Sequence, residues 1–210
     1  MKVLVLGATG GVGQHVVKQL LSRGHNVTAL IRNPEGLKSA PTNMKIIRGD
    51  VLDRRALSAA VDGQDAVIYA VGINSIGPTT LFSDSTRILL DLMQNSGVKR
   101  LVCVTGIGAG ETKGHGGFFY DHIIYPLFAK NRYQDKDRQE KMIRNSGLDW
   151  VIVRPAPFHE GRHNGPLEEV TDVEGVTLRR ISRQEVAQFV VDQLTDDLFL
   201  RQTPFIGHAY

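Results

Sequence analysis

The stretch "GATGGVG" at residues 7–13 decides the fold, since it follows an apolar run and opens a helical pattern. Its glycines, Gly7, Gly10 and Gly13, have a G-x-x-G-x-x-G spacing. The first two let the chain turn sharply and let backbone amides approach a pyrophosphate, while Gly13 lets the helix pack closely on the sheet. The N–H groups and the partial positive charge at the start of a helix favour phosphate. The order of strand, glycine loop and helix therefore predicts a dinucleotide site rather than a turn without a ligand.

Apolar runs and helical patterns alternate along the chain after this loop. The strands read as continuous Val, Ile and Leu runs, as burial on both faces of a sheet requires. Two similar joints, "NSGVKRLV" and "NSGLDWVI", place Gly97 and Gly147 where a left-handed residue closes a helix. The pattern predicts an α/β fold, a doubly wound parallel sheet with helices on both faces. We expect strands at residues 2–7, 26–31, 44–51, 65–72, 99–106 and 148–155, and helices at 13–24, 53–63, 79–96 and 182–194.

The pattern loosens after residue 155, and residues 170–180 suggest a short hairpin or an edge strand. Asp53 is placed to cap one helix, and Ser182 with Glu185 forms a capping box at the start of the last one. We expect residues 1–210 to form a single Rossmann domain, with a small substrate-side region from about residue 155 to residue 210. That region is too short for a substantial substrate domain, which predicts a shallow and open cleft.

The composition is that of an ordinary globular protein, with 41% hydrophobic and 22% charged residues over 210 positions. A net charge of +3 is small and spread along the chain, so we expect no nucleic-acid partner. Apolar runs are too short to span a membrane, which takes about 18 residues or more. A single cysteine, Cys103, lies in an apolar run and suggests a buried small side chain. We expect a cytoplasmic monomer or weak dimer.

The end of the second strand indicates which dinucleotide is bound. An NAD site usually has an acid at this point to bind the ribose hydroxyls. This chain has Arg32 there, with no acid before Glu35, and Lys38 follows. A guanidinium binds a 2′-phosphate through paired hydrogen bonds, whereas a carboxylate repels it. The sequence therefore predicts NADPH over NADH, the alternative being that Arg32 is only a solvated charge.

Six motifs in this order, "GATGGVG", "LIRNPEGL", "GDVLD", "AVIYAVG", "VKRLVCVTG" and "SGLDWVIVRPAPF", carry a family resemblance over the whole chain. The chain resembles an atypical short-chain dehydrogenase/reductase with an NAD(P)-binding Rossmann fold. It is most similar in character to NADPH-dependent biliverdin-IXβ/flavin reductases and NmrA-like oxidoreductases. The resemblance implies pyrophosphate contacts at Thr9, Gly10, Gly11 and Val12, adenine contacts at Asp50 and Val51, adenosine-ribose contacts at Ala70, Val71 and Gly72, and nicotinamide contacts at Thr105, Pro155, Ala156 and Phe158.

The stretch "AKNRYQDKDRQEK" at residues 129–141 bears on the chemistry, because it holds Tyr133 and Lys136 three residues apart. Ordinary short-chain dehydrogenases use a tyrosine four residues ahead of a lysine as their acid–base pair. If Lys136 keeps the family position, the tyrosine position falls on Arg132, four residues before it. Tyr133 is then rotated by about 100° from that position, because successive helical residues turn by this angle. Tyr133 is then a packing or surface residue in preference to a proton donor. Lys136 either contacts the nicotinamide ribose or is one more charge on a solvated face.

The candidate catalytic residues are thus Thr105, Lys136 and Tyr133. The resemblance also implies how a reaction can proceed without the usual tyrosine–lysine pair. The family's serine after the fifth-strand threonine is Gly106 here, which leaves Thr105 as the nearby hydroxyl. The biliverdin/flavin reductases pass hydride directly to a flat conjugated acceptor, a flavin, quinone or bilin, which delocalises the resulting charge. Two alternatives stay open, an NmrA-like NADP(H) sensor without turnover and a sugar epimerase or carbonyl reductase.

The acceptor side is expected to lie after the fifth and sixth strands. A glycine-rich segment after the fifth strand suggests a mobile loop, and its aromatic residues either stack on an acceptor ring or face the core. The loop after the sixth strand contains cationic or titratable side chains that can bind a carboxylate or a phosphate on the acceptor. No metal is expected, because Gly161 makes a helix spanning His159 and His163 unfavourable. The residues concerned are Phe118, Phe119, Tyr120, His159, Arg162 and His163.

Overall fold

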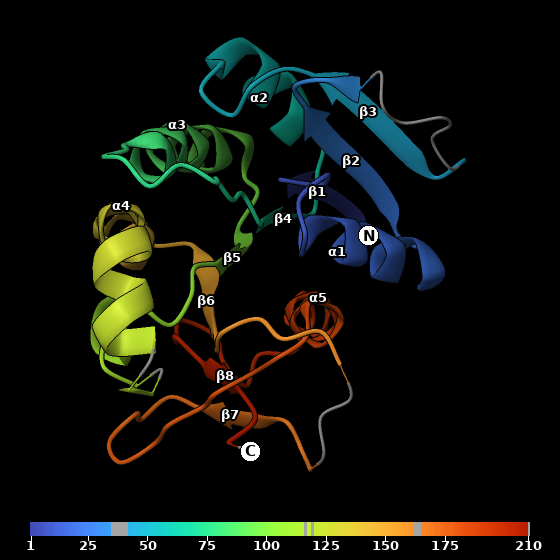
Figure 1. The fold of residues 1–210 in the computed structure, drawn as a ribbon. Helices are drawn as coiled ribbons and strands as arrows, with labels where there is room; N and C mark the ends of the chain where they lie inside the picture. The colour runs from blue at the N-terminus through green and yellow to red at the C-terminus, as the bar shows by residue number, and fades with distance from the viewer. Residues whose placement is uncertain (35–41, 116, 119, 162–164, 210) are drawn as a thin grey trace.

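A computed structural model describes residues 1–34, 42–115, 117–118, 120–161 and 165–209. Within these residues eight strands form one sheet in the order β3-β2-β1-β4-β5-β6-β8-β7 (Figure 1). All neighbouring pairs are parallel except β7 with β8. The strands are β1 Lys2–Leu6, β2 Asn26–Ile31, β3 Met44–Arg48, β4 Ala66–Tyr69, β5 Arg100–Val104, β6 Asp149–Pro155, β7 Glu168–Val170 and β8 Phe205–Gly207.

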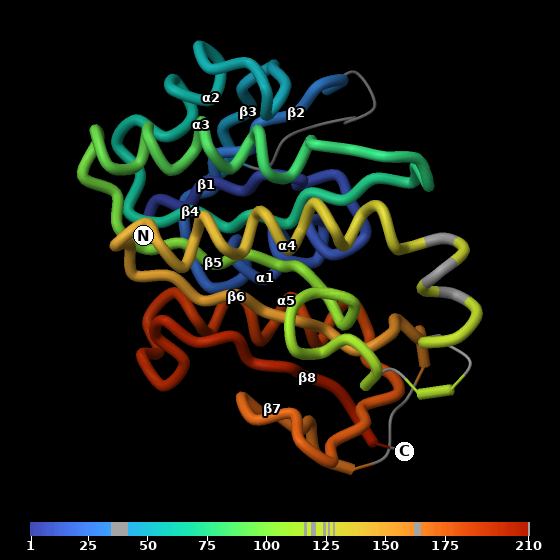
Figure 2. Tube along the Cα trace, turned by 90° about the vertical axis from the view of Figure 1, so that its left-hand side faces the viewer, coloured from blue at the N-terminus to red at the C-terminus, as the bar shows by residue number. Residues whose placement is uncertain are grey.

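Helices cover both faces of the sheet, which confirms the predicted doubly wound α/β fold (Figures 1 and 2). Helices α1 and α5 pack on one face, where alternate strand residues such as Val3 and Val5 form the core with Val16. Helices α2, α3 and α4 cover the other face, where Leu4 and Leu6 are buried. The helices are α1 Gly13–Ser22, α2 Arg54–Val61, α3 Leu81–Ser96, α4 Lys130–Arg144 and α5 Arg183–Asp192, with a short 3₁₀ turn η2 at Gly110–Thr112 and a π-helical segment η3 at Tyr120–Ala129.

The predicted helix ends have the expected chemistry. The Asp53 carboxylate accepts hydrogen bonds from two backbone amides in the first turn of α2. Ser182 and Glu185 form the reciprocal capping box of α5. Gly97 and Gly147 have φ values of 75° and 71°, as a left-handed residue after a helix requires. These local signals hold because they depend on neighbours only a few residues away.

Most predicted elements are a few residues longer than the observed ones, and three differences bear on the fold. Helix α3 begins at Leu81 rather than Thr79, and Thr80 is its N-cap. A short hairpin or edge strand was expected at residues 170–180, but the edge strand β7 lies at Glu168–Val170 and shares only Val170 with that range. Strand β8 was not predicted: its three residues are too few to show a periodicity, and it is defined by pairing with the distant β6 and β7. It adds a parallel strand beyond β6 and leaves β7 at the edge.

Cys103 is fully buried in the core between the sheet and α3, and burial raises the pKa of its thiol. It is a packing residue, as predicted. In the part of the chain that the structure describes, no helix combines the length and the apolar character needed to cross a membrane. The compartment, the oligomeric state and the division near residue 155 stay predictions.

Candidate functional site

The glycine loop is pressed against the end of β4, and its first glycine makes this contact feasible. Gly7 has φ 85°, and a Cβ there would lie 2.5 Å from the carbonyl oxygen of Ala70 and 2.8 Å from the amide of Val71. A Cβ on Gly13 would lie 1.9 Å from the carbonyl oxygen of Gly7, so α1 begins directly on the loop. The Gly10 amide donates to the Gly7 carbonyl at 2.9 Å. Only glycines allow this close turn, and the residues present fit a dinucleotide cradle.

The outer side of the loop faces solvent at the carboxyl edge of the sheet. Thr9 and Gly11 are exposed, as is Gly72 beyond β4, while Val12 packs into the core. Gly11 has one close neighbour, Arg183, at the start of α5: a Cβ on Gly11 would lie 2.6 Å from the Arg183 Nε atom. The predicted pyrophosphate contacts thus surround an accessible backbone turn. Arg183 was not among them, because it lies far away in the sequence.

The groups predicted to bind the adenosine end lie after β2 and β3. The Arg32 Nε atom is 3.7 Å from the Asp50 Oδ2 atom, and 76% of the Arg32 side chain is exposed. The other Asp50 oxygen accepts from the Leu52 amide at 2.9 Å, and Val51 packs partly into the core. An exposed ion pair of this length contributes little free energy, so a phosphate can compete with Asp50 for the Arg32 guanidinium. Lys38 lies outside the described residues.

The predicted nicotinamide contacts lie at the ends of β5 and β6. Thr105 is 6% exposed, and its hydroxyl donates to the Oε1 atom of Glu140 in α4 at 2.7 Å. The Ile107 amide donates to the Pro155 carbonyl at 3.1 Å, and the Ala156 amide donates to Ile206 in β8. These backbone contacts fix the two strand ends beside each other. The Phe158 side chain, further along, is 44% exposed.

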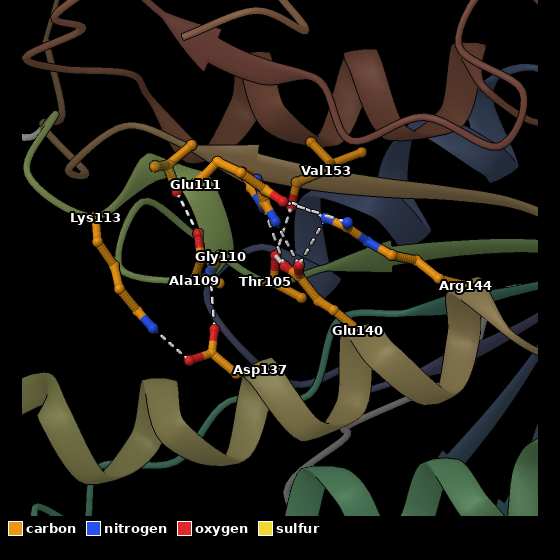
Figure 3. Close-up of polar contacts among 11 residues, drawn as sticks. Thr105, Ala109, Gly110, Glu111, Lys113, Asp137, Glu140, Arg144 and Val153 are labelled. Atoms are coloured by element: carbon orange, nitrogen blue, oxygen red, sulfur yellow. Dashed lines mark hydrogen bonds and ion pairs between the residues drawn. The ribbon is translucent and has the colours of Figure 1, made fainter. Parts of the chain in front are cut away.

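A buried ion-pair network lies beneath the Thr105 hydroxyl (Figure 3). Glu140 from α4 and Arg154 from β6 are 3% and 1% exposed and form two hydrogen bonds, at 2.6 and 3.2 Å. Arg154 also donates to Glu111 at 2.6 Å. Partial burial alone would raise the pKa of Glu111, but hydrogen bonds from Arg144 and Arg154 outweigh it and lower the pKa to about 2. The network joins α4, β6 and the loop after β5.

Lys136 lies inside the protein, which contradicts the alternative of a solvated charge. It is 7% exposed, and its Nζ atom donates to the Thr105 carbonyl at 2.6 Å and to the Val104 carbonyl at 3.4 Å. Burial lowers the pKa of its ammonium group to about 8. A ribose contact from Lys136 stays a prediction, and in this arrangement the ammonium group holds the end of β5.

Tyr133 packs over the two glycines that follow β5. A Cβ on Gly106 would lie 2.5 Å from the Tyr133 hydroxyl, and a Cβ on Gly108 would lie 2.4 Å from its ring. Gly106 has φ 142°, a conformation that favours glycine. The Lys136 Nζ atom is 6.0 Å from the Tyr133 ring centroid. The phenol therefore occupies the space that a side chain at position 106 would need.

The loop after β5 is hydrogen-bonded to α4 over its first part, and the expected mobility stays a prediction (Figure 3). The Gly110 amide and the Lys113 ammonium group both donate to Asp137, at 2.8 and 2.5 Å. Phe118 is 77% exposed, so the core-facing alternative is wrong for this residue. The side chain of Tyr120, and Phe119, Arg162 and His163 altogether, lie outside the described residues.

Sequence reasoning missed the inward charges of α4. Asp135 is fully buried and accepts from the Phe82 amide at 2.8 Å, which caps α3 from a different helix. Glu140 and Arg154 were also missed as a pair. A signal was present, because an arginine inside the apolar run "WVIVRP" has to be paired if it is buried.

The fold and the glycine cradle define a dinucleotide-binding Rossmann protein. The chain belongs to the NAD(P)H-binding family, whose sequence model matches residues 7–197. This assignment confirms the predicted fold family and the nicotinamide cofactor, and it leaves the choice between NADPH and NADH open.

Named relatives agree with the family. An uncharacterized chloroplastic protein of Arabidopsis thaliana, At2g34460, is 32% identical over 93% of this chain and 72% of that protein. A solved Rossmann-fold NAD(P)-binding family protein from Shigella flexneri is 27% identical, with a TM-score of 0.75 over 99% of this chain and 93% of that one. ChuY of Escherichia coli O157:H7, described as an anaerobillin reductase, is similar in fold, with a TM-score of 0.81 at 21% identity over 99% of this chain and 97% of that one.

Proposed function

We propose that this protein is an NADPH-dependent oxidoreductase that transfers hydride directly to a flat conjugated acceptor, a flavin, a quinone or a bilin-like molecule. NADPH supplies the hydride when it is bound. The glycine loop would orient the dinucleotide, and the ends of β5 and β6 would hold the nicotinamide, against which the acceptor would lie. Positioning of two flat rings against each other then provides most of the rate enhancement.

The observation that carries this proposal is the inward direction of the polar groups at the end of β5. Lys136 donates to the carbonyls of Val104 and Thr105, and the Thr105 hydroxyl donates to Glu140. In this arrangement both groups position the strand end and neither acts as the proton donor. A reaction that needs no protein proton donor is favoured, because a conjugated acceptor delocalises the charge it gains and takes its proton from water.

The preference for NADPH is supported by Arg32. Its guanidinium is largely exposed at the end of β2, and its Nε atom is 3.7 Å from Asp50. A 2′-phosphate offers the paired hydrogen bonds that this contact lacks. In this proposal Arg32 moves from Asp50 to the phosphate, which leaves the Asp50 carboxylate to accept from the adenine amino group.

The choice of acceptor is supported only at the level of class. The structural neighbour ChuY is described as an anaerobillin reductase, a name in line with a bilin-like acceptor. The Phe158 side chain, 44% exposed after β6, is an aromatic group on the acceptor side of the sheet edge. Flavin, quinone and bilin share the planar conjugated ring system on which the argument rests.

An acceptor panel tests the proposal. Purified protein is mixed with NADPH and with FMN, a soluble quinone, biliverdin, an aromatic aldehyde or a nucleotide sugar, and NADPH oxidation is followed by absorbance. We expect steady oxidation with at least one of the first three and none with the aldehyde or the sugar. Oxidation of NADPH with the aldehyde alone would support the carbonyl reductase instead. Conversion of the nucleotide sugar to its epimer, which consumes no NADPH and is followed by chromatography, would support the epimerase. Tight NADPH binding without oxidation on the whole panel would support an NmrA-like sensor.

A further inference from the structure

Arg183 lies directly on the glycine loop, although it belongs to the last helix of the chain. A Cβ on Gly11 would lie 2.6 Å from the Arg183 Nε atom and 2.9 Å from its Cδ atom. The stem of the arginine therefore covers the exposed backbone turn in which a dinucleotide places its pyrophosphate. The contact thereby places the positively charged guanidinium of Arg183 beside the glycine loop.

The backbone that carries Arg183 is held in place on both sides. Ser182 caps α5 and bonds with Glu185, whose carboxylate also contacts His208 at 2.9 Å. Helices α1 and α5 lie alongside each other on one face of the sheet, so the starts of both helices meet at Gly11 (Figure 1). A cation in the first turn of a helix opposes the helix dipole. Helix stability therefore does not explain an arginine at this position.

The tip of Arg183 contacts the loop after β6. Its guanidinium lies 4.7 Å from the centre of the Phe158 ring and forms an ion pair with Glu160. Phe158 forms a bridge with Ile181, two residues before the arginine. The Glu160 side chain is 55% exposed, and the hydrogen bond from Arg183 lowers the pKa of its carboxyl. An exposed single carboxylate is a weak partner in comparison with a pyrophosphate carrying two charges.

We propose that Arg183 is a second phosphate-binding residue, which exchanges Glu160 for the pyrophosphate of the nicotinamide dinucleotide while its guanidinium stays stacked on Phe158. This inference rests on the dinucleotide binding of the proposed function and is independent of the acceptor. Because Phe158 belongs to the loop predicted to hold the nicotinamide, the exchange links the pyrophosphate contact to the nicotinamide contact. Glu160 then acts as a competitor that weakens binding.

Calorimetric titration of NADPH into full-length variants tests the exchange. Arg183→Met keeps the length of the side chain and removes the charge, and we expect its NADPH Kd to rise roughly tenfold. Glu160→Gln frees the guanidinium, and we expect its Kd to fall about threefold. This gain should vanish in the double variant. Arg23→Met is the matched control, because Arg23 forms an exposed ion pair with Asp192 at the far ends of the same two helices.

A second ligand distinguishes the contribution of Arg183 from that of Arg32. Adenosine 2′-monophosphate lacks the pyrophosphate, so its inhibition constant, measured by displacement of NADPH, should be unchanged in Arg183→Met and should rise in Arg32→Met. An unchanged NADPH Kd in both Arg183→Met and Glu160→Gln overturns the inference. If Arg183→Met does not fold, an unchanged Kd in Glu160→Gln alone overturns it. Absence of NADPH binding by the wild type would instead refute the proposed function as well.

Discussion

The Tyr133 hydroxyl lies 2.5 Å from the point that a Cβ of residue 106 would occupy, so the glycine at 106 and the tyrosine at 133 fit together. The resemblance to biliverdin and flavin reductases implies a serine at position 106, whereas here that position is glycine and a phenol from α4 fills the space. The Lys136 Nζ atom is directed at backbone carbonyls and lies 6.0 Å from the Tyr133 ring centroid. In the proposed mechanism the lysine therefore does not prepare this phenol for proton transfer.

Replacement of Tyr133 by phenylalanine should leave hydride transfer nearly intact. The ring keeps its packing over Gly106 and Gly108, and only the hydroxyl is removed. We expect kcat with FMN or a quinone to change by less than about threefold, under about 0.7 kcal/mol of activation free energy. Steady-state kinetics at saturating NADPH measure it. A loss of a hundredfold or more would make Tyr133 the proton donor and would refute the mechanism proposed here.

Neutralising Glu140 should destabilise the fold strongly. Glu140→Gln leaves the Arg154 guanidinium buried, with the largely exposed Glu111 as its remaining charged partner in the part of the chain that the structure describes. Removal of one partner of a buried pair typically costs about 3–5 kcal/mol, and we expect about 3 kcal/mol in the free energy of unfolding. Urea denaturation measures this change. The control Asp91→Asn removes an exposed ion pair with Arg54 and should cost less than about 1 kcal/mol. Equal effects of the two substitutions would contradict the structural role of the network.

Lys136 should make stability depend on pH in the alkaline range. Burial lowers the pKa of Lys136 in the folded protein to about 8, below its ordinary value of 10.5. The unfolded chain therefore binds more protons between these values, so this contribution to stability is complete above 10.5 and is lost as the pH falls through 8. Relative to Lys136→Met, the wild type should gain about 2 kcal/mol between roughly pH 8 and pH 10. Urea denaturation of both proteins across this range measures the difference, and parallel curves would show that Lys136 titrates normally.

Removal of the Arg32 charge should weaken NADPH binding without affecting NADH. Arg32→Met deletes the guanidinium near Asp50 and keeps most of the side chain. We expect the NADPH Kd to rise roughly tenfold or more and the NADH Kd to stay within about twofold. Calorimetric titration of both dinucleotides gives the two constants. If the NADPH Kd and the NADH Kd rise equally, Arg32 does not bind the 2′-phosphate.

The fold could be predicted from the sequence because its signals are local. The glycine spacing, the caps of α2 and α5 and the apolar strand runs each depend on residues close together in the chain. Strand β8 was missed since three residues carry no readable period. Its place in the sheet depends on partners about fifty residues away in β6.

The site was only partly predictable. The sequence placed the glycine loop and the candidate residues at the strand ends, yet it suggested a solvated face for the charged helix α4. Asp135, Lys136 and Glu140 instead point inward, because their partners Phe82, Thr105 and Arg154 come from other elements. The contact of Arg183 with Gly11 joins opposite ends of the chain, and no local pattern indicates it.

Direct hydride transfer is the central claim, and a single-turnover experiment tests it most directly. Protein saturated with NADPH, or with NADPH deuterated at the transferred position of nicotinamide C4, is mixed rapidly with the preferred acceptor of the panel, and acceptor reduction is followed. The account predicts reduction at a rate that falls upon deuteration and is insensitive to Tyr133→Phe. A protein that binds NADPH tightly and reduces none of the flavin, quinone and bilin acceptors would contradict it.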